Sequence, residues 1–210
     1  MKPIDIQTWS RRELYEHFST LDHPFYSVTV PLDVTNALAA AHREKLSFYH
    51  TMVWLCTRAM LSVPAFNLRI IDGRVYELDS VKPSFTAPAA EGNFMFVTLP
   101  WNSDLRAFCA GAQAASAAQT SLFGPYADAC DTVFFSCLPW FDFTAMTNAR
   151  RIDSSDAIPR LAWGKYASEG RRTLLHLSIE VNHRTVDGRH IGQFIAAVER
   201  GIASLDDVLQ

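Results

Sequence analysis

Apolar and polar positions along the chain follow two different periods. Residues 25–34 alternate strictly, with one side formed by Phe25, Ser27, Thr29 and Pro31 and the other by Tyr26, Val28, Val30 and Leu32. Such a period of two predicts a strand. Residues 188–204 instead carry an apolar stripe at helical spacing, made of Ile191, Phe194, Ile195, Val198 and Ile202. This period predicts a final helix that packs one face on a core.

The remaining elements follow from the same patterns and from turn residues. Helices are expected at 11–19 with Ser10 as N-cap, 35–45, 48–63 and 103–119. The 48–63 helix is apolar over most of its surface and is expected to be buried. Strands are expected at 93–100, in one or two pieces within 131–146, and in two hairpins that turn at Asp72-Gly73 and Glu169-Gly170. This order predicts a single α/β domain over residues 1–210, with helices packed on a mixed sheet.

Composition and net charge limit the classes of partner that the chain is expected to bind. With 210 residues, 49% of them apolar, the chain is long enough for a sizeable core, and a net charge of -3 gives no reason to expect nucleic acid or an anionic membrane surface as partner. No apolar run approaches the length of a membrane span, and residues 1–18 lack the apolar segment of a signal peptide, so we expect a cytoplasmic protein. The scattered histidines predict no metal site. The four cysteines are expected to be reduced core thiols; they are Cys56, Cys109, Cys130 and Cys137.

One polar cluster stands out at the end of an apolar run. The stretch IEVNHRTVDGRHIGQF, residues 179–194, places His183 after a predicted strand and Asp187 four residues later. An imidazole titrates close to neutrality, so His183 could take a proton from an alcohol and return it. The alternative is structural: Asp187 caps the 188–204 helix, and His183 only ends a strand. Taken alone, His183, Asp187 and Gly188 favour the structural interpretation.

Six stretches in register over nearly the whole chain resemble the chloramphenicol acetyltransferases. They are IDIQTWSRRELYEHF, LSFYHTM, DGRVYELDSVKPSFT, LPWFDFTAM, GKYASEG and VNHRTVDGRHIGQF. The resemblance implies a two-layer α/β sandwich of the CoA-dependent acyltransferase fold and acetyl-CoA as co-substrate. It also implies a homotrimer with its site between subunits and a small hydroxylated acceptor.

The resemblance also implies roles for individual residues. His183 matches the general base, and Asp187 with Arg11 matches a structural ion pair. The positions that contact CoA are matched by Tyr49, Lys165 and Tyr166, and the acceptor wall is matched by Phe18, Pro24 and Tyr26.

Some positions differ from the family pattern. Ala145 stands where we expect the serine that supports the oxyanion, beside Thr144, and Ala162 stands for a nearby threonine. Asn182 and Arg189 replace a histidine and an aromatic residue around the motif. A lost oxyanion donor typically costs about 10² to 10³ in rate. An Ala145→Ser change is expected to raise kcat by only about tenfold, because Ala162 leaves the second support missing.

Three functions therefore compete. The first is an O-acetyltransferase whose acceptor is chloramphenicol or another small alcohol. The second is a dihydrolipoamide-type acyltransferase that acts on a thiol, since that relative shares the HxxxDG motif. The third is a binding protein that retains the fold without the chemistry. The sequence does not identify the acceptor.

Overall fold

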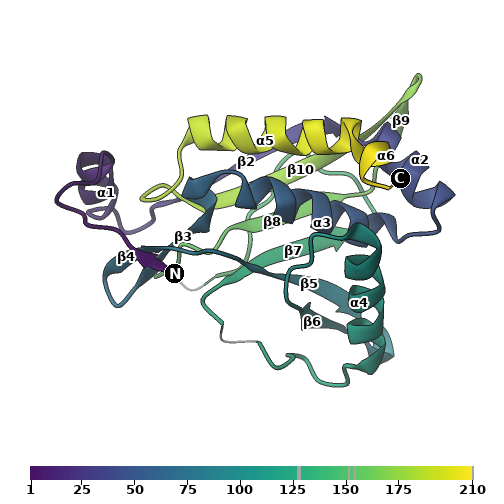
Figure 1. Cartoon of the computed structure of the whole chain (residues 1–210), viewed down its shortest axis with the longest axis horizontal. Helices are drawn as coiled ribbons and strands as arrows, with labels where there is room; N and C mark the ends of the chain where they lie inside the picture. The colour runs from purple at the N-terminus through teal and green to yellow at the C-terminus, as the bar shows by residue number, and fades with distance from the viewer. Residues whose placement is uncertain (127–128, 151, 154, 210) are drawn as a thin grey trace.

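A computed structural model describes residues 1–126, 129–150, 152–153 and 155–209 (Figure 1). The strands are β1 (Lys2–Pro3), β2 (Phe25–Asp33), β3 (Leu68–Ile71), β4 (Arg74–Glu77), β5 (Lys82–Pro88), β6 (Phe94–Thr98), β7 (Thr132–Leu138), β8 (Arg160–Gly164), β9 (Ala167–Glu169) and β10 (Arg172–Asn182). The helices are α1 (Arg12–Phe18), α2 (Thr35–Arg43), α3 (Phe48–Leu61), α4 (Leu105–Ala118), α5 (Gly188–Ala203) and α6 (Leu205–Val208), with two short 3-10 helices, η1 (Pro64–Asn67) and η2 (Ala90–Gly92).

The main sheet has the order β2-β10-β8-β7-β5-β6, and β9 pairs with β10. The pairs β5 with β7 and β7 with β8 are parallel, while the other pairs are antiparallel. The predicted mixed sheet is therefore confirmed. The hairpin at Asp72-Gly73 is confirmed too, because both residues have positive φ (50° and 74°), as a type I′ turn requires.

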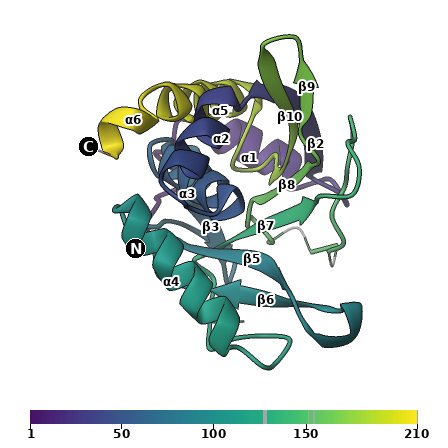
Figure 2. The same cartoon turned by 90° about the vertical axis from the view of Figure 1, so that its right-hand side faces the viewer.

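The helices cover one face of the main sheet (Figure 2). The face of β10 toward them carries Leu177, Ile179 and Val181, which belong to the main core with the buried residues of α3 and α5. The opposite face carries Ser178 and Glu180, and it is covered in part by the loop segment that follows β7. A sheet with one face free of helices has room for a site there.

A second, smaller sheet lies at one end of the molecule. It has the order β1-β4-β3 and packs near α1 (Figure 1), with a small core of its own made of Tyr15, Leu68, Ile70, Val75 and Ala157. This arrangement places α1 close to the end of β10, where the HxxxDG motif lies.

The structure corrects several expectations. Strand β5 was not predicted, because Pro83 and Pro88 argue against a strand inside a sheet. Ser10 is not the N-cap of α1; Arg11 occupies that position without a side-chain cap. Residues 131–146 form one strand, β7, followed by loop. Cys130 is exposed just before that strand, whereas Cys56 and Cys109 are buried as expected.

Candidate active site

The end of β10 brings three distant segments together around His183. The His183 N–H donates to Pro24 O at 2.6 Å, which ties the strand end to the start of β2. The imidazole stacks on the ring of Phe18 with centroids 3.8 Å apart and planes 10° apart. The ring of Tyr26 lies on it at 4.5 Å and 33°. His183 therefore has a fixed ring orientation, and Phe18, Pro24 and Tyr26 surround it within one chain.

Several polar atoms in this cluster are buried without a partner among the described residues. They are Nδ1 of His183, Oη of Tyr26, and Nε and Nη2 of Arg11. Burial, followed by the negative charge of Asp187, raises the pKa of Tyr26 to about 12, so its hydroxyl keeps its proton. Buried polar groups are nearly always paired in folded proteins, so their concentration here indicates a site completed by a water, a ligand or another chain.

Asp187 has two structural roles. Its carboxylate accepts from the N–H groups of Arg189 at 3.0 Å and His190 at 3.3 Å, and its own N–H donates to His190 Nδ1 at 3.1 Å. This is a capping box at the start of α5. The other carboxylate oxygen forms an ion pair with Nη1 of Arg11. The cap and the ion pair, which the sequence offered as alternatives, therefore coexist.

The charges around Asp187 affect its ionisation. Burial by itself raises the pKa of Asp187, but the hydrogen bond from Arg11 and the contacts with His190 outweigh it and hold the pKa below its usual value of 3.8. The carboxylate is therefore ionised near neutral pH, where it can anchor Arg11 and the first turn of α5.

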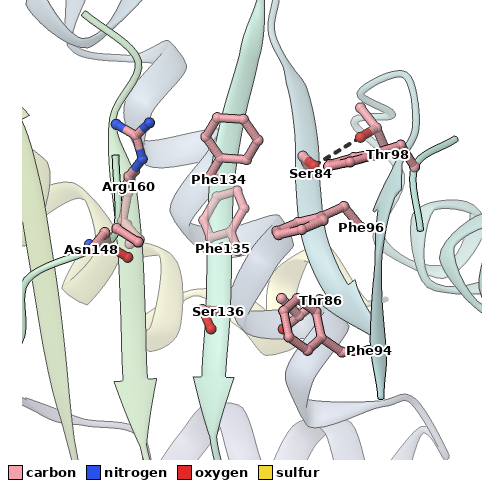
Figure 3. A pocket seen from close by; sticks show the side chains of 13 residues that line it. Ser84, Thr86, Phe94, Phe96, Thr98, Phe134, Phe135, Ser136, Asn148 and Arg160 are labelled. Atoms are coloured by element: carbon pink, nitrogen blue, oxygen red, sulfur yellow. Dashed lines mark hydrogen bonds between the residues drawn. The ribbon is translucent and has the colours of Figure 1, made fainter. Parts of the chain in front are cut away.

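A second region lies on the helix-free face over β6, β5, β7 and β8 (Figure 3). It is a cavity of about 470 Å³, and five of the thirteen residues that line it are phenylalanines. Phe96 stacks on Phe123 at 5.3 Å, and Phe94 meets Phe96 edge to face at 5.4 Å. The residues that line it are Ser84, Thr86, Phe94, Phe96, Thr98, Phe123, Phe134, Phe135, Ser136, Asn148, Ala149, Arg160 and Leu161. We refer to it below as the aromatic pocket.

The aromatic pocket is not among the sites expected from the sequence, although the sequence carries a signal for it. Phe94, Phe96 and Thr98 alternate on one side of β6, as Phe134 and Ser136 do on β7. Phe94 and Phe123 remain 54% and 53% exposed, which is unusual for rings that only fill a core. A strand that presents aromatic side chains on one face and core residues on the other, as β6 does with Met95 and Val97, indicates a binding surface on the aromatic face.

The structure changes the expectation about the oxyanion donor. Ala145 is exposed and does not line the aromatic pocket, and neighbouring Thr144 is exposed too. Ser136 lines the pocket and is in register with Ala162 on β8, which is in turn in register with Ser178 on β10. Ala162 is fully buried between these two serines. A hydroxyl is therefore present in the pocket, at position 136 rather than 145.

The three residues expected to contact CoA differ in their exposure. Tyr49 is largely buried against Phe85 and Trp163, with its hydroxyl 3.4 Å from Thr86 Oγ1, and burial raises its pKa. Lys165 and Tyr166 are exposed on the segment between β8 and β9. The Lys165 N–H donates to Phe141 O at 2.8 Å, beside the exposed ring of Trp140. Lys165 and Tyr166 are thus accessible to a ligand, whereas Tyr49 is largely buried.

His183 and Ser136 lie far apart within one chain. Ser136 is level with Ser178, which is five residues before His183 on β10 and two strands away from β7. Five residues of strand and two strand spacings correspond to roughly 20 Å. The base candidate and the pocket hydroxyl of the same chain therefore cannot both reach one small acceptor.

Comparison with known proteins identifies the family of this chain. The family model for chloramphenicol acetyltransferase covers residues 1–199. The chain belongs to the chloramphenicol acetyltransferase family. It is therefore an acyltransferase by family, and the resemblance noted in the sequence is confirmed.

Individual relatives agree with this family assignment. A chloramphenicol acetyltransferase of Escherichia coli is 28% identical over 201 residues, which are 94% of this chain and 91% of that one. A relative of the same name from Bacillus pumilus is 27% identical over 99% of this chain and 96% of its own length. A solved chloramphenicol acetyltransferase superimposes with a TM-score of 0.88 at 26% identity, covering 96% of this chain and 99% of that chain.

More distant structures share the fold. The cubic core of the pyruvate dehydrogenase multienzyme complex superimposes with a TM-score of 0.69 at 19% identity, over 93% of this chain and 88% of that chain. The expected CoA-dependent acyltransferase fold is thus confirmed. Among the described residues, no helix is long and apolar enough to cross a membrane. Within the same residues, no group of three or more His, Cys, Asp or Glu side chains could hold a metal ion.

Proposed function

We propose that this chain transfers an acetyl group from acetyl-CoA to a hydroxyl of a small molecule, with His183 as the general base. The observation that carries the proposal is the His183 cluster, in which the imidazole is held between Phe18 and Tyr26 beside buried polar atoms that lack partners. An oriented imidazole in an incomplete polar cluster fits a proton-transfer site better than it fits a simple strand end.

The reaction follows from the chemistry of an imidazole. Nδ1 of His183 is buried, so Nε2 is the nitrogen that an acceptor would reach. Nε2 removes the proton of the acceptor hydroxyl as its oxygen attacks the thioester carbonyl. The tetrahedral intermediate then expels the CoA thiolate, which takes the proton back from the imidazolium. The products are an acetyl ester and free CoA, and the imidazole is again neutral.

Ser136 is the candidate donor for the negative oxygen of the intermediate. Its hydroxyl lines the aromatic pocket, and no hydrogen bond from it to another described residue competes for the donor. A donor placed where charge develops contributes mainly to the transition state. This proposal is an alternative to the expectation that Ala145 stands at the position of a lost donor.

The separation of His183 and Ser136 supports a site shared between copies of the chain. One acceptor could contact both groups only if His183 of one copy faced the aromatic pocket of another. The exposed rings at the rim, Phe94 and Phe123, favour such contact because they would lose apolar surface to water on assembly. We therefore propose a homo-oligomer. We further propose that it is a trimer, the assembly that the family resemblance implies.

The proposed acceptor is chloramphenicol or another small hydroxylated molecule with an aromatic part. The relatives named above are chloramphenicol acetyltransferases, and five of the thirteen residues that line the pocket of this chain are phenylalanines. Aromatic rings pack well against an aryl group of an acceptor. Lys165 and Tyr166 are the exposed residues proposed to contact CoA, with Tyr49 behind them.

The decisive experiment measures the CoA thiol released from acetyl-CoA, by chromatographic quantitation of CoA itself, with a panel of acceptors that includes chloramphenicol and dihydrolipoamide. We expect thiol release with at least one alcohol and its loss in His183→Ala. Transfer to dihydrolipoamide alone would favour the thiol acyltransferase instead. Parent and His183→Ala chains that release thiol equally would remove His183 from the mechanism, and no release with any acceptor would favour a binding protein.

A further inference from the structure

Four charged side chains meet on the helix-free face between the His183 cluster and the aromatic pocket. Arg150 Nε lies 2.8 Å from Glu180 Oε1, and Arg150 Nη1 lies 3.6 Å from Asp156 Oδ2. Arg160 Nη2 approaches the same Asp156 oxygen at 2.9 Å. The side chains of Arg150 and Glu180 are only 4% and 5% exposed, so this pair is almost fully removed from water. We call these four residues the ionic cluster.

Glu180 connects the ionic cluster to the wall of the aromatic pocket. Its Oε2 accepts from the Asn148 backbone N–H at 2.7 Å and from Asn148 Nδ2 at 3.3 Å. Asn148 and the next residue, Ala149, line the pocket, as does Arg160, whose guanidinium lies 5.4 Å from the Phe134 centroid (Figure 3). One carboxylate thus holds the backbone of a loop that has no strand pairing of its own at this point.

The same cluster reaches the residues around His183. The Arg150 guanidinium lies 3.9 Å from the centroid of Phe25, which is between Pro24 and Tyr26 in the chain. The backbone carbonyl of Asp156 accepts from Asn182 Nδ2 at 3.1 Å, and Asn182 directly precedes His183. The ionic cluster therefore contacts both parts of the candidate site, which are the aromatic pocket and the residues around His183.

Stability alone is a weak reason for such a cluster. Removing two charges from water costs several kcal/mol, and apolar residues of similar volume often replace a buried ion pair with no loss of stability. What an apolar pair cannot supply is the acceptor oxygen that holds the Asn148 N–H in place.

We infer that Glu180 is a positioning residue for acceptor binding: its carboxylate fixes the Asn148–Ala149 wall of the aromatic pocket. The inference rests on the proposed function, because it assigns that pocket to the acceptor. Glu180 itself does not touch the reacting atoms.

The test is the Glu180→Gln variant, which keeps the shape of the side chain but replaces the carboxylate between Asn148 and Arg150 with a neutral amide that has a single acceptor oxygen. The loss of one charge-assisted hydrogen bond predicts a rise of about tenfold in the acceptor KM. The KM for acetyl-CoA should stay close to the parental value, and hydrogen exchange of the Asn148 amide should become faster. An unchanged acceptor KM together with unchanged exchange would overturn the inference.

Two further variants separate positioning from folding. Arg150→Met combined with Glu180→Leu removes both charges and should largely restore the free energy of unfolding, while the acceptor KM stays raised. A return of the acceptor KM to the parental value in this double variant would assign Glu180 to stability only. Asp206→Asn is the matched control, because its ion pair with Arg43 is exposed and lies outside the site, so neither KM should change.

The assay also distinguishes this inference from the proposed function. If the parent releases thiol and Glu180→Gln has the parental acceptor KM, only the inference fails. If the parent releases no thiol with any acceptor, the proposed function fails. Exchange of the Asn148 amide then still decides whether the carboxylate holds the pocket wall, and unchanged exchange would overturn that part as well.

Discussion

The two halves of the candidate site are built in different ways. Around His183, local order comes from the motif itself, because Asp187 lies four residues after the imidazole and caps α5, while Arg11 pairs with Asp187 from the far end of the chain. The aromatic pocket is assembled from four strands whose pocket-facing residues lie up to 77 positions apart, from Ser84 to Leu161. One half is visible as a local pattern in the sequence, and the other becomes visible only when the strands are placed side by side.

The halves also differ in what they lack. The His183 cluster contains buried polar atoms without partners, whereas the aromatic pocket exposes apolar rings that would normally be covered. The two deficits differ in kind, because a phenylalanine ring cannot supply the hydrogen bonds that the polar atoms lack. Covering the rings with the His183 end of another copy would therefore satisfy only the second.

The largest expected effect is that of His183→Ala, which removes the base from the first half. General acid–base catalysis contributes about 10² to 10⁴ in rate, so kcat should fall by that range while acetyl-CoA binding persists. Steady-state kinetics and calorimetry of CoA binding measure the two quantities. A kcat that falls only in proportion to a loss of folded protein would contradict the catalytic role.

Mixing variants tests whether the halves belong to different copies. Chains with His183→Ala and chains with Ser136→Ala are co-expressed and purified as mixed oligomers. If each site uses His183 from one copy and Ser136 from another, some mixed sites are intact, and activity exceeds the sum of the two separate variants. Activity equal to that sum would place both groups in one chain or exclude Ser136.

The next effect is expected in the pocket itself. Ser136→Ala should lower kcat by about 10², with little change in the acceptor KM, because the hydroxyl acts on charge that develops in the transition state. Ala145→Ser should leave kcat close to the parental value, since residue 145 is exposed outside the pocket. A large gain from Ala145→Ser with no loss from Ser136→Ala would restore the expectation drawn from the sequence.

The two halves of the site differ in how much of each can be predicted from the sequence. The alternation of 25–34, the α5 stripe and the Asp187 cap are local patterns, and each is found where it was predicted. The pocket depends on which strands are neighbours in the sheet. Its central strand, β5, is not predicted from the sequence, because Pro83 and Pro88 argue against a strand there. Without β5 there is no way to see that Ser84, Phe134 and Arg160 share a row.

A smaller effect, on stability, separates the two roles of Asp187. Asp187→Asn keeps an N-cap of similar quality and removes only the ion pair, whereas Asp187→Ala removes both and should cost about 1 kcal/mol more. In urea unfolding, Asp187→Asn and Arg11→Met should each destabilise, and the double variant less than their sum. Fully additive losses would show that the two side chains are not coupled.

The pH dependence gives an independent check on the same pair. The pKa of Asp187 is lowered from 3.8 in the folded protein, so its contribution to stability is present above that value and is lost as the pH falls through the lower folded-state pKa. The difference in unfolding free energy between parent and Asp187→Asn should therefore shrink only at pH values below 3.8. A difference that already disappears between pH 5 and 7 would point to another titrating group.

The smallest effect is expected for Lys165, which lies outside both halves, on the exposed segment next to Trp140 and Tyr166. An exposed cation that meets a phosphate contributes up to about 1 kcal/mol, so Lys165→Met should raise the KM for acetyl-CoA by about fivefold at most and leave the acceptor KM alone. Because salt screens such contacts, the parental KM should rise with ionic strength, and that of the variant should respond less. Lys2→Met is the control, since Lys2 is 76% exposed in the small sheet. If both lysine variants behave like the parent at low salt, CoA does not approach along the segment between β8 and β9, and the two halves must receive it from another side.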